Sequence, residues 1–179
     1  EACGAKGIHH AIVVSGGFKE VGPEGAVREK EMAAIAQKYG ISIIGPNCLG
    51  VTNTHARLNT TPHRYYGKPG FIGLVSQSGS FVTQMFAYLD QLNLGFSTAF
   101  SIGNEVNTDL VDCLEYLGAC PETKVIALYV EAIRRGRHFV EVARRIVPHK
   151  PIVALYVGGS ETGRRAALSH TGSMSGPDD

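Results

Sequence analysis

The sequence contains no tryptophan, only four cysteines among 179 residues, and only 18% charged residues. The cysteines (Cys3, Cys48, Cys113 and Cys120) form no CxxC pair and have no histidine at metal-ligand spacing. They therefore predict reduced thiols of a cytoplasmic protein, and no metal site. No secretory leader is visible, and no apolar run approaches the ~18 residues of a membrane-spanning helix. We therefore expect a soluble protein with no membrane partner.

An excess of charge of either sign is also lacking. The 17 Lys and Arg residues balance 16 Asp and Glu residues for a net charge of +1, and the basic residues are scattered, which argues against a nucleic-acid partner. A hydrophobic content of 44% predicts a globular chain with a sizeable core. The length allows one domain, or one and a fraction. The 22 glycines are well above the average of about 7% and indicate many tight strand-to-helix turns.

Most of the chain alternates short apolar runs with longer mixed stretches. After residue 70 this pattern predicts strands at 71–75, 96–101, 124–130 and 151–157, and helices at 79–92, 108–117 and 137–146. Strands separated by helices of this length are typical of βαβ units and a parallel sheet. The pattern therefore predicts an α/β fold with a flavodoxin-like doubly wound sheet, in which ligands gather at the carboxyl ends of the strands.

The first part of the chain predicts only half of a nucleotide-binding sheet. It contains a buried strand at 8–14, a helix at 23–39 that begins with a proline and stops at Gly40, and a strand at 41–44. Residues 52–69 hold no period and predict a connection between units. Either another chain completes this sheet or the sequence is a fragment of a larger protein, and we favour the fragment.

One histidine stands in a segment that offers it almost no apolar neighbours. His170 follows the apolar stretch 152–157 and lies within the run SHTGS at 169–173, with glycines on both sides. Such a histidine is not easily packed into a core. The segment therefore predicts a loop that carries a reactive imidazole between two places.

The turn after the strand at 71–75 predicts an anion site. Ser78, Gly79 and Ser80 would leave backbone N–H groups free at the N-terminus of the next helix, where an anion is favoured. The alternative is an ordinary serine N-cap worth about 1 kcal/mol. No lysine follows the glycine, so the turn is not a Walker loop.

A serine hydrolase is a rival interpretation of the same turn. Ser78 would be the nucleophile, with His170 as base and Asp112 as the acid of a triad. A nucleophile elbow needs glycine two residues before the nucleophile, and Ser76 occupies that place. A hydrolase is therefore disfavoured.

Polar residues follow other predicted strands as well. Glu131 ends an apolar strand and could accept an imidazole N–H, although a solvated glutamate paired with a nearby arginine (Arg134 or Arg135) would explain it equally. The loop 103–109 could line a site or simply cap the next helix. In the rigid turn at 45–50, Asn47 and Cys48 could approach a ligand, but turn geometry and a buried thiol explain both.

Several motifs together resemble the NDP-forming acyl-CoA synthetases, the superfamily of succinyl-CoA synthetase and the ADP-forming acetyl-CoA synthetases. The motifs, in the order of that family, are IGPNCLG at 44–50, VSQSGS at 75–80, SIGN at 101–104, YVE at 129–131 and SHTG at 169–172. The resemblance covers essentially the whole chain. It implies that residues 1–66 are the later part of a Rossmann-like CoA-binding domain. Residues 67–179 would be a flavodoxin-like CoA-ligase domain that ends in a phosphohistidine loop.

The resemblance also implies roles for individual residues. His170 would be the phosphorylated nucleophile and Glu131 the carboxylate that orients it, while Asn47 and Cys48 would lie on the side of CoA and the acyl group. The implied phosphate-binding residues are Gln77, Ser78, Gly79, Ser80 and Gly172.

The implied reaction interconverts acyl-CoA, NDP and phosphate with a free acid, CoA and NTP. Its ligands would be CoA, a small carboxylic acid, and ATP or ADP with Mg²⁺ on an ATP-grasp subunit or domain outside this chain. We expect an oligomer. The alternative is a non-catalytic acyl-CoA-sensing module of a larger protein such as a lysine acetyltransferase fusion.

Overall fold

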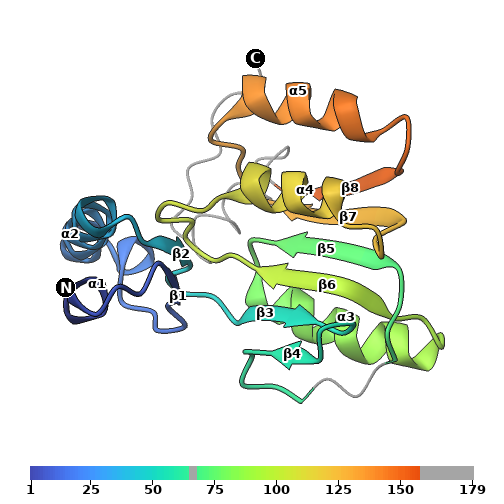
Figure 1. The fold of residues 1–179 in the computed structure, drawn as a ribbon, viewed down its shortest axis with the longest axis horizontal. Helices are drawn as coiled ribbons and strands as arrows, with labels where there is room; N and C mark the ends of the chain where they lie inside the picture. The colour runs from blue at the N-terminus through green and yellow to red at the C-terminus, as the bar shows by residue number, and fades with distance from the viewer. Residues whose placement is uncertain (65–67, 158–179) are drawn as a thin grey trace.

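The computed structural model describes residues 1–64 and 68–157, which form two sheets (Figure 1). The smaller sheet has the order β1-β2, and the larger has the order β4-β3-β6-β5-β7-β8. The strands are β1 (His10–Ile12), β2 (Ser42–Ile44), β3 (Gly50–Asn53), β4 (Leu58–Asn59), β5 (Ile72–Ser76), β6 (Phe96–Ser101), β7 (Val125–Val130) and β8 (Ile152–Tyr156). The helices are α1 (Ala2–Ala5), α2 (Pro23–Tyr39), α3 (Gly79–Gln91), α4 (Leu110–Ala119) and α5 (Gly136–Ile146), with a 3₁₀ turn η1 (Lys19–Val21).

The larger sheet confirms the predicted flavodoxin-like fold. Strands β6, β5, β7 and β8 are mutually parallel, and β5 lies between β6 and β7. The chain therefore runs from β5 to β6 on one side and returns past β5 to β7 on the other. In doubly wound sheets such a reversal of strand order marks the place where ligands bind, at the carboxyl ends of the strands.

Helices cover both faces of this sheet, so there are two cores. On β5, Leu74 packs with Val82 of α3, whereas the next residue, Val75, packs on the opposite face with Leu114 of α4 and Val142 of α5. These side chains are at most 1% exposed. Each contributes about 1.5–3 kcal/mol through burial, which makes the carboxyl ends of the central strands a rigid platform.

The smaller sheet with helix α2 forms a separate unit beside the larger sheet (Figure 1). Helix α2 has the predicted bounds, and Gly40 ends it in the left-handed conformation with φ 63°. The first strand lies within the predicted range 8–14, but it is shorter than predicted and not buried, and Ile8 and Val14 beside it are 45% and 44% exposed. The described sheet has only two strands, so β1 has neighbours on one edge only.

The irregular connection predicted for residues 52–69 was wrong in part. Strand β3 pairs antiparallel with β6, and β4 pairs antiparallel with β3, so residues 50–59 extend the larger sheet. These strands escaped prediction because they are short and rich in Thr and Asn, which pair through side chains as well as the backbone. The domain boundary between residues 66 and 67 stays a proposal.

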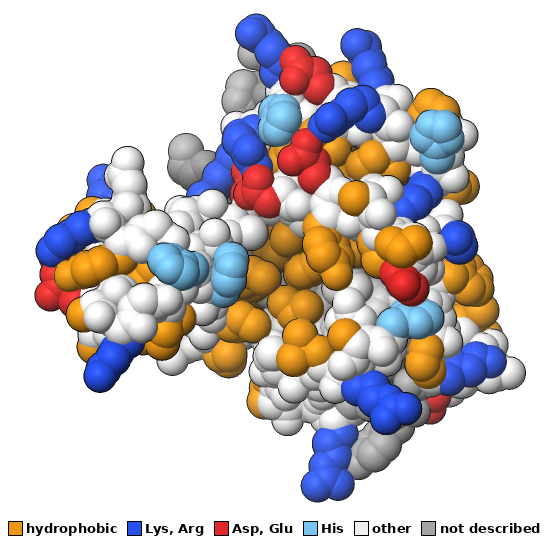
Figure 2. All heavy atoms as spheres, in the orientation of Figure 1, with side chains coloured by type: hydrophobic (Ala, Val, Ile, Leu, Met, Phe, Trp, Pro, Cys, Tyr) orange, Lys and Arg blue, Asp and Glu red, His pale blue; other side chains and the backbone are white. Residues whose placement is uncertain are grey.

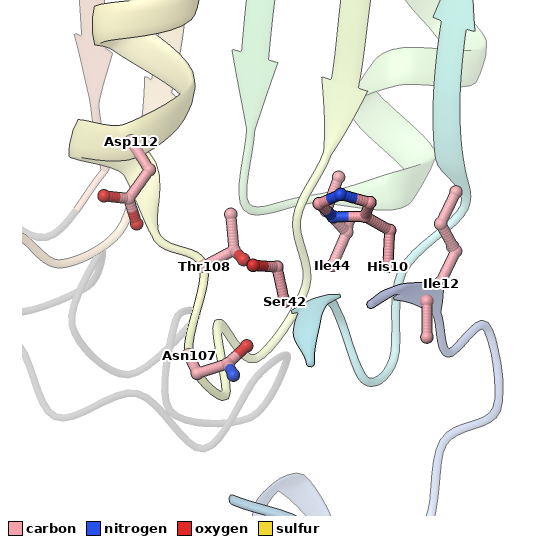
Figure 3. A pocket seen from close by; sticks show the side chains of 8 residues that line it. His10, Ile12, Ser42, Ile44, Asn107, Thr108 and Asp112 are labelled. Atoms are coloured by element: carbon pink, nitrogen blue, oxygen red, sulfur yellow. The ribbon is translucent and has the colours of Figure 1, made fainter. Parts of the chain in front are cut away.

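The face between the two units is hollowed and apolar (Figure 2). One pocket of about 300 Å³ lies over β3 and β6, where Val51, Phe100 and Tyr116 line it. A neighbouring pocket of about 620 Å³ lies between the smaller sheet and the start of α4, with His10 on one wall and Asp112 on the other (Figure 3). Among the residues that the structure describes, none of those predicted to bind phosphate or CoA lines either pocket. Across residues 1–64 and 68–157, no helix combines the length and apolarity needed to cross a membrane.

Candidate functional site

The loops that follow β5, β6 and β7 meet at the carboxyl edge of the larger sheet. Gln77 directly follows β5 and Glu131 directly follows β7, which are adjacent parallel strands. The backbone N–H of Gln77 donates to the carbonyl of Tyr129 at 3.2 Å, so the pairing continues past the end of β5. The structure therefore brings the predicted phosphate turn and the predicted orienting carboxylate together where the strand order reverses.

Glu131 is a buried carboxylate, with 1% of its surface exposed. Its backbone N–H donates to the side-chain oxygen of Gln77, which fixes the residue at the end of β7. Burial, together with the Glu131 carboxylate, raises the pKa of Tyr129. The Tyr129 ring packs against Phe81 of α3 with ring centroids 4.6 Å apart. Helix α3 and strand β7 are thus in contact beside Glu131.

The alternative of a solvated Glu131 paired with an arginine was wrong. Arg134 pairs with Glu105 and donates to the main-chain oxygens of residues 104–105. Arg135 makes a bidentate pair with Asp109 instead. Both arginines therefore tie the β7–α5 loop to the β6–α4 loop.

The start of helix α3 offers backbone donors at the same edge. Ser78 is the N-cap, and its hydroxyl accepts from Phe81 at 3.4 Å, as an ordinary cap does. Within the described residues, the backbone N–H groups of Gly79 and Ser80 have no acceptor. Ser80 is exposed, and its hydroxyl lies 3.1 Å from that of Ser78. Free N–H groups and hydroxyls at a helix N-terminus suit a phosphate.

Gln77 differs from the serines beside it. Its side-chain oxygen accepts from the backbone N–H groups of Glu131 and Ala132, and its side-chain nitrogen donates to the Ala132 carbonyl at 2.7 Å and to Glu105 at 3.1 Å. The side chain is buried, and these bonds use every donor and acceptor of the amide. A direct side-chain contact from Gln77 to phosphate, as the resemblance implied, would have to replace one of them.

Glu105 is a second buried carboxylate that the sequence did not single out. It is 5% exposed, and burial raises its pKa to about 7, an effect that the Arg134 guanidinium opposes. One carboxylate oxygen accepts from the Leu110 backbone N–H at 2.8 Å, and the other accepts from Gln77. The polar loop 103–109 was the only signal, and it was equally explained by the cap that Asp109 indeed provides.

The turn between β2 and β3 packs against this loop. Asn47 has a left-handed backbone with φ 56°, and its side-chain nitrogen donates to the side-chain oxygen of Asn104 at 3.4 Å. Cys48 is buried with its sulfur 3.4 Å from the Val13 carbonyl, and burial raises the pKa of the thiol to about 11. The geometry gives Cys48 the properties of a packed thiol. The CoA or acyl contacts of both residues stay predictions.

The hydrolase interpretation gains no support from this geometry. Ser78 is 3% exposed with an extended backbone (φ −101°), and its hydroxyl caps α3. Asp112 completes the cap of α4 and pairs with Arg135. An exposed hydroxyl on a strained turn, which a nucleophile elbow provides, is missing at Ser78. His170 and Gly172 lie outside the described residues, so their predicted roles stay predictions.

Comparison with known proteins identifies the family. Residues 69–179 match the model of the succinyl-CoA ligase like flavodoxin domain. The chain is 46% identical over 174 residues to acetate–CoA ligase (ADP-forming) II subunit alpha of Pyrococcus furiosus, which covers 97% of this chain and 38% of that protein. It is 42% identical over 176 residues to acetate–CoA ligase (ADP-forming) I of Archaeoglobus fulgidus, with 98% of this chain and 26% of that protein covered.

A solved structure agrees with these sequence matches. The dinucleotide forming acetyl-coenzyme A synthetase 1 of Ca. Korarchaeum cryptofilum, in complex with phosphate and ADP, superposes with a TM-score of 0.90 at 40% identity. The match covers 97% of this chain and 38% of that one, so the chain spans well under half the length of these relatives. The chain therefore belongs to the succinyl-CoA ligase family, through the flavodoxin-like domain matched by its residues 69–179.

Proposed function

We propose that this chain is the CoA-ligase core of an NDP-forming acyl-CoA synthetase that works through a phosphohistidine. Inorganic phosphate would displace CoA from acyl-CoA to give an acyl phosphate. His170 would then attack the phosphorus, forming an N–P bond and releasing the free carboxylic acid. Finally the phosphoryl group would pass from His170 to NDP, which restores the neutral imidazole and gives NTP. Each step transfers one group and needs no oxidant or reductant.

The observation that carries this proposal is the juxtaposition of Glu131 with the start of α3. A buried carboxylate that accepts one imidazole N–H fixes the tautomer and leaves the other ring nitrogen nucleophilic. The N–H groups of Gly79 and Ser80, which have no acceptor among residues 1–64 and 68–157, would hold the phosphoryl oxygens together with the hydroxyls of Ser78 and Ser80. A nucleophile, an orienting base and an anion cradle would thus meet at one sheet edge.

The partners follow from the same assignment. CoA would lie toward the smaller sheet near Asn47 and Cys48, and ATP or ADP with Mg²⁺ would bind an ATP-grasp subunit or domain outside this chain. We further propose a cytoplasmic location and an oligomeric assembly. A non-catalytic acyl-CoA-sensing module is not favoured, because the relatives named above are ligases and synthetases.

Intact mass of the whole protein with its ATP-grasp portion, Mg²⁺ and ATP tests the proposal. Measured at alkaline pH, the chain should gain one acid-labile phosphoryl group, and His170→Ala should not gain it. Glu131→Gln should slow the gain by about 10²-fold, because the imidazole would lose the carboxylate that orients it. As a control, His138→Ala on the outer part of α5 should label as the wild type does. Labelling that persists in His170→Ala would refute the relay.

A further inference from the structure

One side-chain amide joins the three loops of the candidate site. The Gln77 oxygen receives both N–H groups of the Glu131–Ala132 turn, and its nitrogen returns a bond to the Ala132 carbonyl at 2.7 Å. Gln77 therefore pairs with this backbone as a neighbouring strand would. The pairing extends β5 and β7 by one further step beyond their last residues.

The far side of the amide is anchored by Glu105. The remaining N–H of Gln77 donates to the Glu105 carboxylate at 3.1 Å, and the other carboxylate oxygen is held by the N–H of Leu110 in the first turn of α4. Arg134, in the β7–α5 loop, also contacts Glu105. Its guanidinium lies 3.8 Å from the Glu105 carboxylate and donates to the Glu105 main-chain carbonyl. Glu105 thus contacts both Gln77, which bonds to the Glu131 backbone, and Arg134, which lies three residues after Glu131.

We propose that Gln77, anchored by Glu105, is the positioning residue that holds the Glu131 carboxylate at a fixed position relative to the start of α3. This inference rests on the proposed function, because it assigns Gln77 a role through Glu131 in the phosphorylation of His170. Gln77 touches the backbone of the turn rather than the reacting atoms. This positioning role takes the place of the direct phosphate contact that the family resemblance implied for the Gln77 side chain.

The Gln77 amide fixes the backbone from which the Glu131 side chain extends. A backbone that ends a strand normally frays, because its N–H and C=O groups lose their partners. At Glu131 the buried side-chain amide of Gln77 supplies those partners. The Glu131 side chain therefore extends from a backbone whose position is fixed. Misplacement of a catalytic group by about 1 Å costs about 10²-fold in rate. Loss of the amide should therefore reduce the rate of chemistry more than the affinity for substrate.

The test compares Gln77→Met, which keeps the length and removes the amide, with Gln77→Glu, in the whole protein with its ATP-grasp portion. Phosphorylation of His170 by ATP, measured by rapid quench, should slow about 10²-fold in Gln77→Met, while KM for ATP and for acyl-CoA changes less than about threefold. Hydrogen exchange at the amides of Glu131 and Ala132 should accelerate in the same variant. Gln84→Met, an exposed glutamine on α3, is the matched control and should leave the rate and these amides unchanged.

The Gln77→Glu variant separates positioning from a general loss of structure. Its introduced carboxylate would add a negative charge beside Glu105, in a cluster that also holds Asp109, Glu131, Arg134, Arg135 and Lys19, and it cannot donate until it is protonated. The phosphorylation rate of Gln77→Glu, relative to that of the wild type, should therefore rise as the pH of the assay is lowered from about 8 to about 6. This range brackets the raised pKa of the neighbouring Glu105, about 7. Gln77→Met should show no such recovery.

The outcomes are distinguishable from those of the proposed function. If the wild type does not label, the relay itself is wrong. If the wild type labels and Gln77→Met labels at the same rate, the positioning role is wrong while the relay stands. Equal losses in both variants at every pH would also overturn the positioning role, since they would indicate a purely structural defect.

Discussion

At the scale of single residues, Gly103 decides how closely two loops can approach. It adopts a left-handed backbone with φ 56°, and a Cβ there would lie 2.3 Å from the main-chain oxygens of both Pro46 and Asn47. The Asn104 backbone N–H, one residue on, donates to the Pro46 carbonyl at 2.8 Å. Only glycine combines this conformation with this contact. The predicted CoA turn at 45–50 is thus pressed directly against the loop that carries Glu105.

We expect Gly103→Ala to lower the free energy of unfolding by about 3 kcal/mol, from the left-handed penalty plus displacement of the 45–48 backbone. Urea unfolding followed by circular dichroism measures this. Gly136→Ala is the control, because it begins α5 and a Cβ there meets nothing within 4 Å. That variant should be neutral or stabilised by up to about 1 kcal/mol. Equal stability of the two variants would contradict the close approach.

At the scale of elements, the start of α4 is held by carboxylates from its own loop. Asp109 accepts from the first turn, and Asp112 returns a bond to the Asp109 N–H, which completes a capping box. Glu105 adds a bond to the Leu110 N–H from five residues upstream. Helix α4 therefore begins at a fixed place, and its start is coupled through Glu105 to Gln77 and the site.

The buried Glu105 makes stability depend on pH in a definite direction. Its pKa is raised from 4.5 to about 7 in the folded state, so between these values the folded chain binds more protons than the unfolded chain. This contribution to the free energy of unfolding is present below about pH 4.5 and is lost as pH rises through about 7. Glu105→Gln does not titrate, so it should lack this dependence.

Urea unfolding at pH 5 and pH 8 checks the expectation. The wild type, compared with Glu105→Gln, should be more favoured at pH 5 than at pH 8 by 1 kcal/mol or more, since each unit of pKa shift corresponds to about 1.4 kcal/mol. Glu141→Gln, on the exposed side of α5, serves as the control for surface charge. A difference between wild type and Glu105→Gln that is the same at both pH values would refute the assignment.

At the scale of the whole molecule, Asn104 joins the two units. Its side-chain nitrogen donates to Glu20 at 2.6 Å and to Glu29 at 2.8 Å, both from the smaller unit. Its carbonyl accepts from Lys19 of that unit and from Arg134 of the β7–α5 loop. The proposed CoA side and the proposed phosphate side are therefore connected through one residue.

Asn104→Ala should remove the amide donor that Glu20 and Glu29 share, while both carboxylates keep their bonds to backbone N–H groups of residues 17–19, and should weaken this junction by about 1–3 kcal/mol. Because the chain has no tryptophan, circular dichroism and hydrogen exchange are the suitable measurements. Exchange in α2 should rise before exchange in β5 and β7 changes. Lys38→Ala, at the exposed pair with Glu1, should change stability by less than about 0.5 kcal/mol. Uniform exchange across both units in Asn104→Ala would contradict a junction role.

Much of the fold followed from local pattern. The apolar runs and the helix limits at Pro23, Gly40 and Gly79 are local signals, so α2, α3 and β6 were predicted to within a residue. The short strands β3 and β4 were not predicted, because their Thr and Asn residues become strand only by pairing with β6 and with each other. The buried state of Glu131 was likewise open, since a glutamate at a strand end is solvated or buried according to what other loops place over it.

The sequence by itself determined the alternation of strands and helices after residue 70, the family motifs and the choice of His170 and Glu131 as candidates, because periodicity and residue type are properties of neighbouring positions. Only the tertiary structure decided that Gln77 holds the Glu131 turn, that Glu105 is buried beneath it and that Asn104 joins the units. Those contacts link residues that are 28 to 84 positions apart. No local pattern encodes them, because they exist only once parallel strands bring their carboxyl ends to one edge.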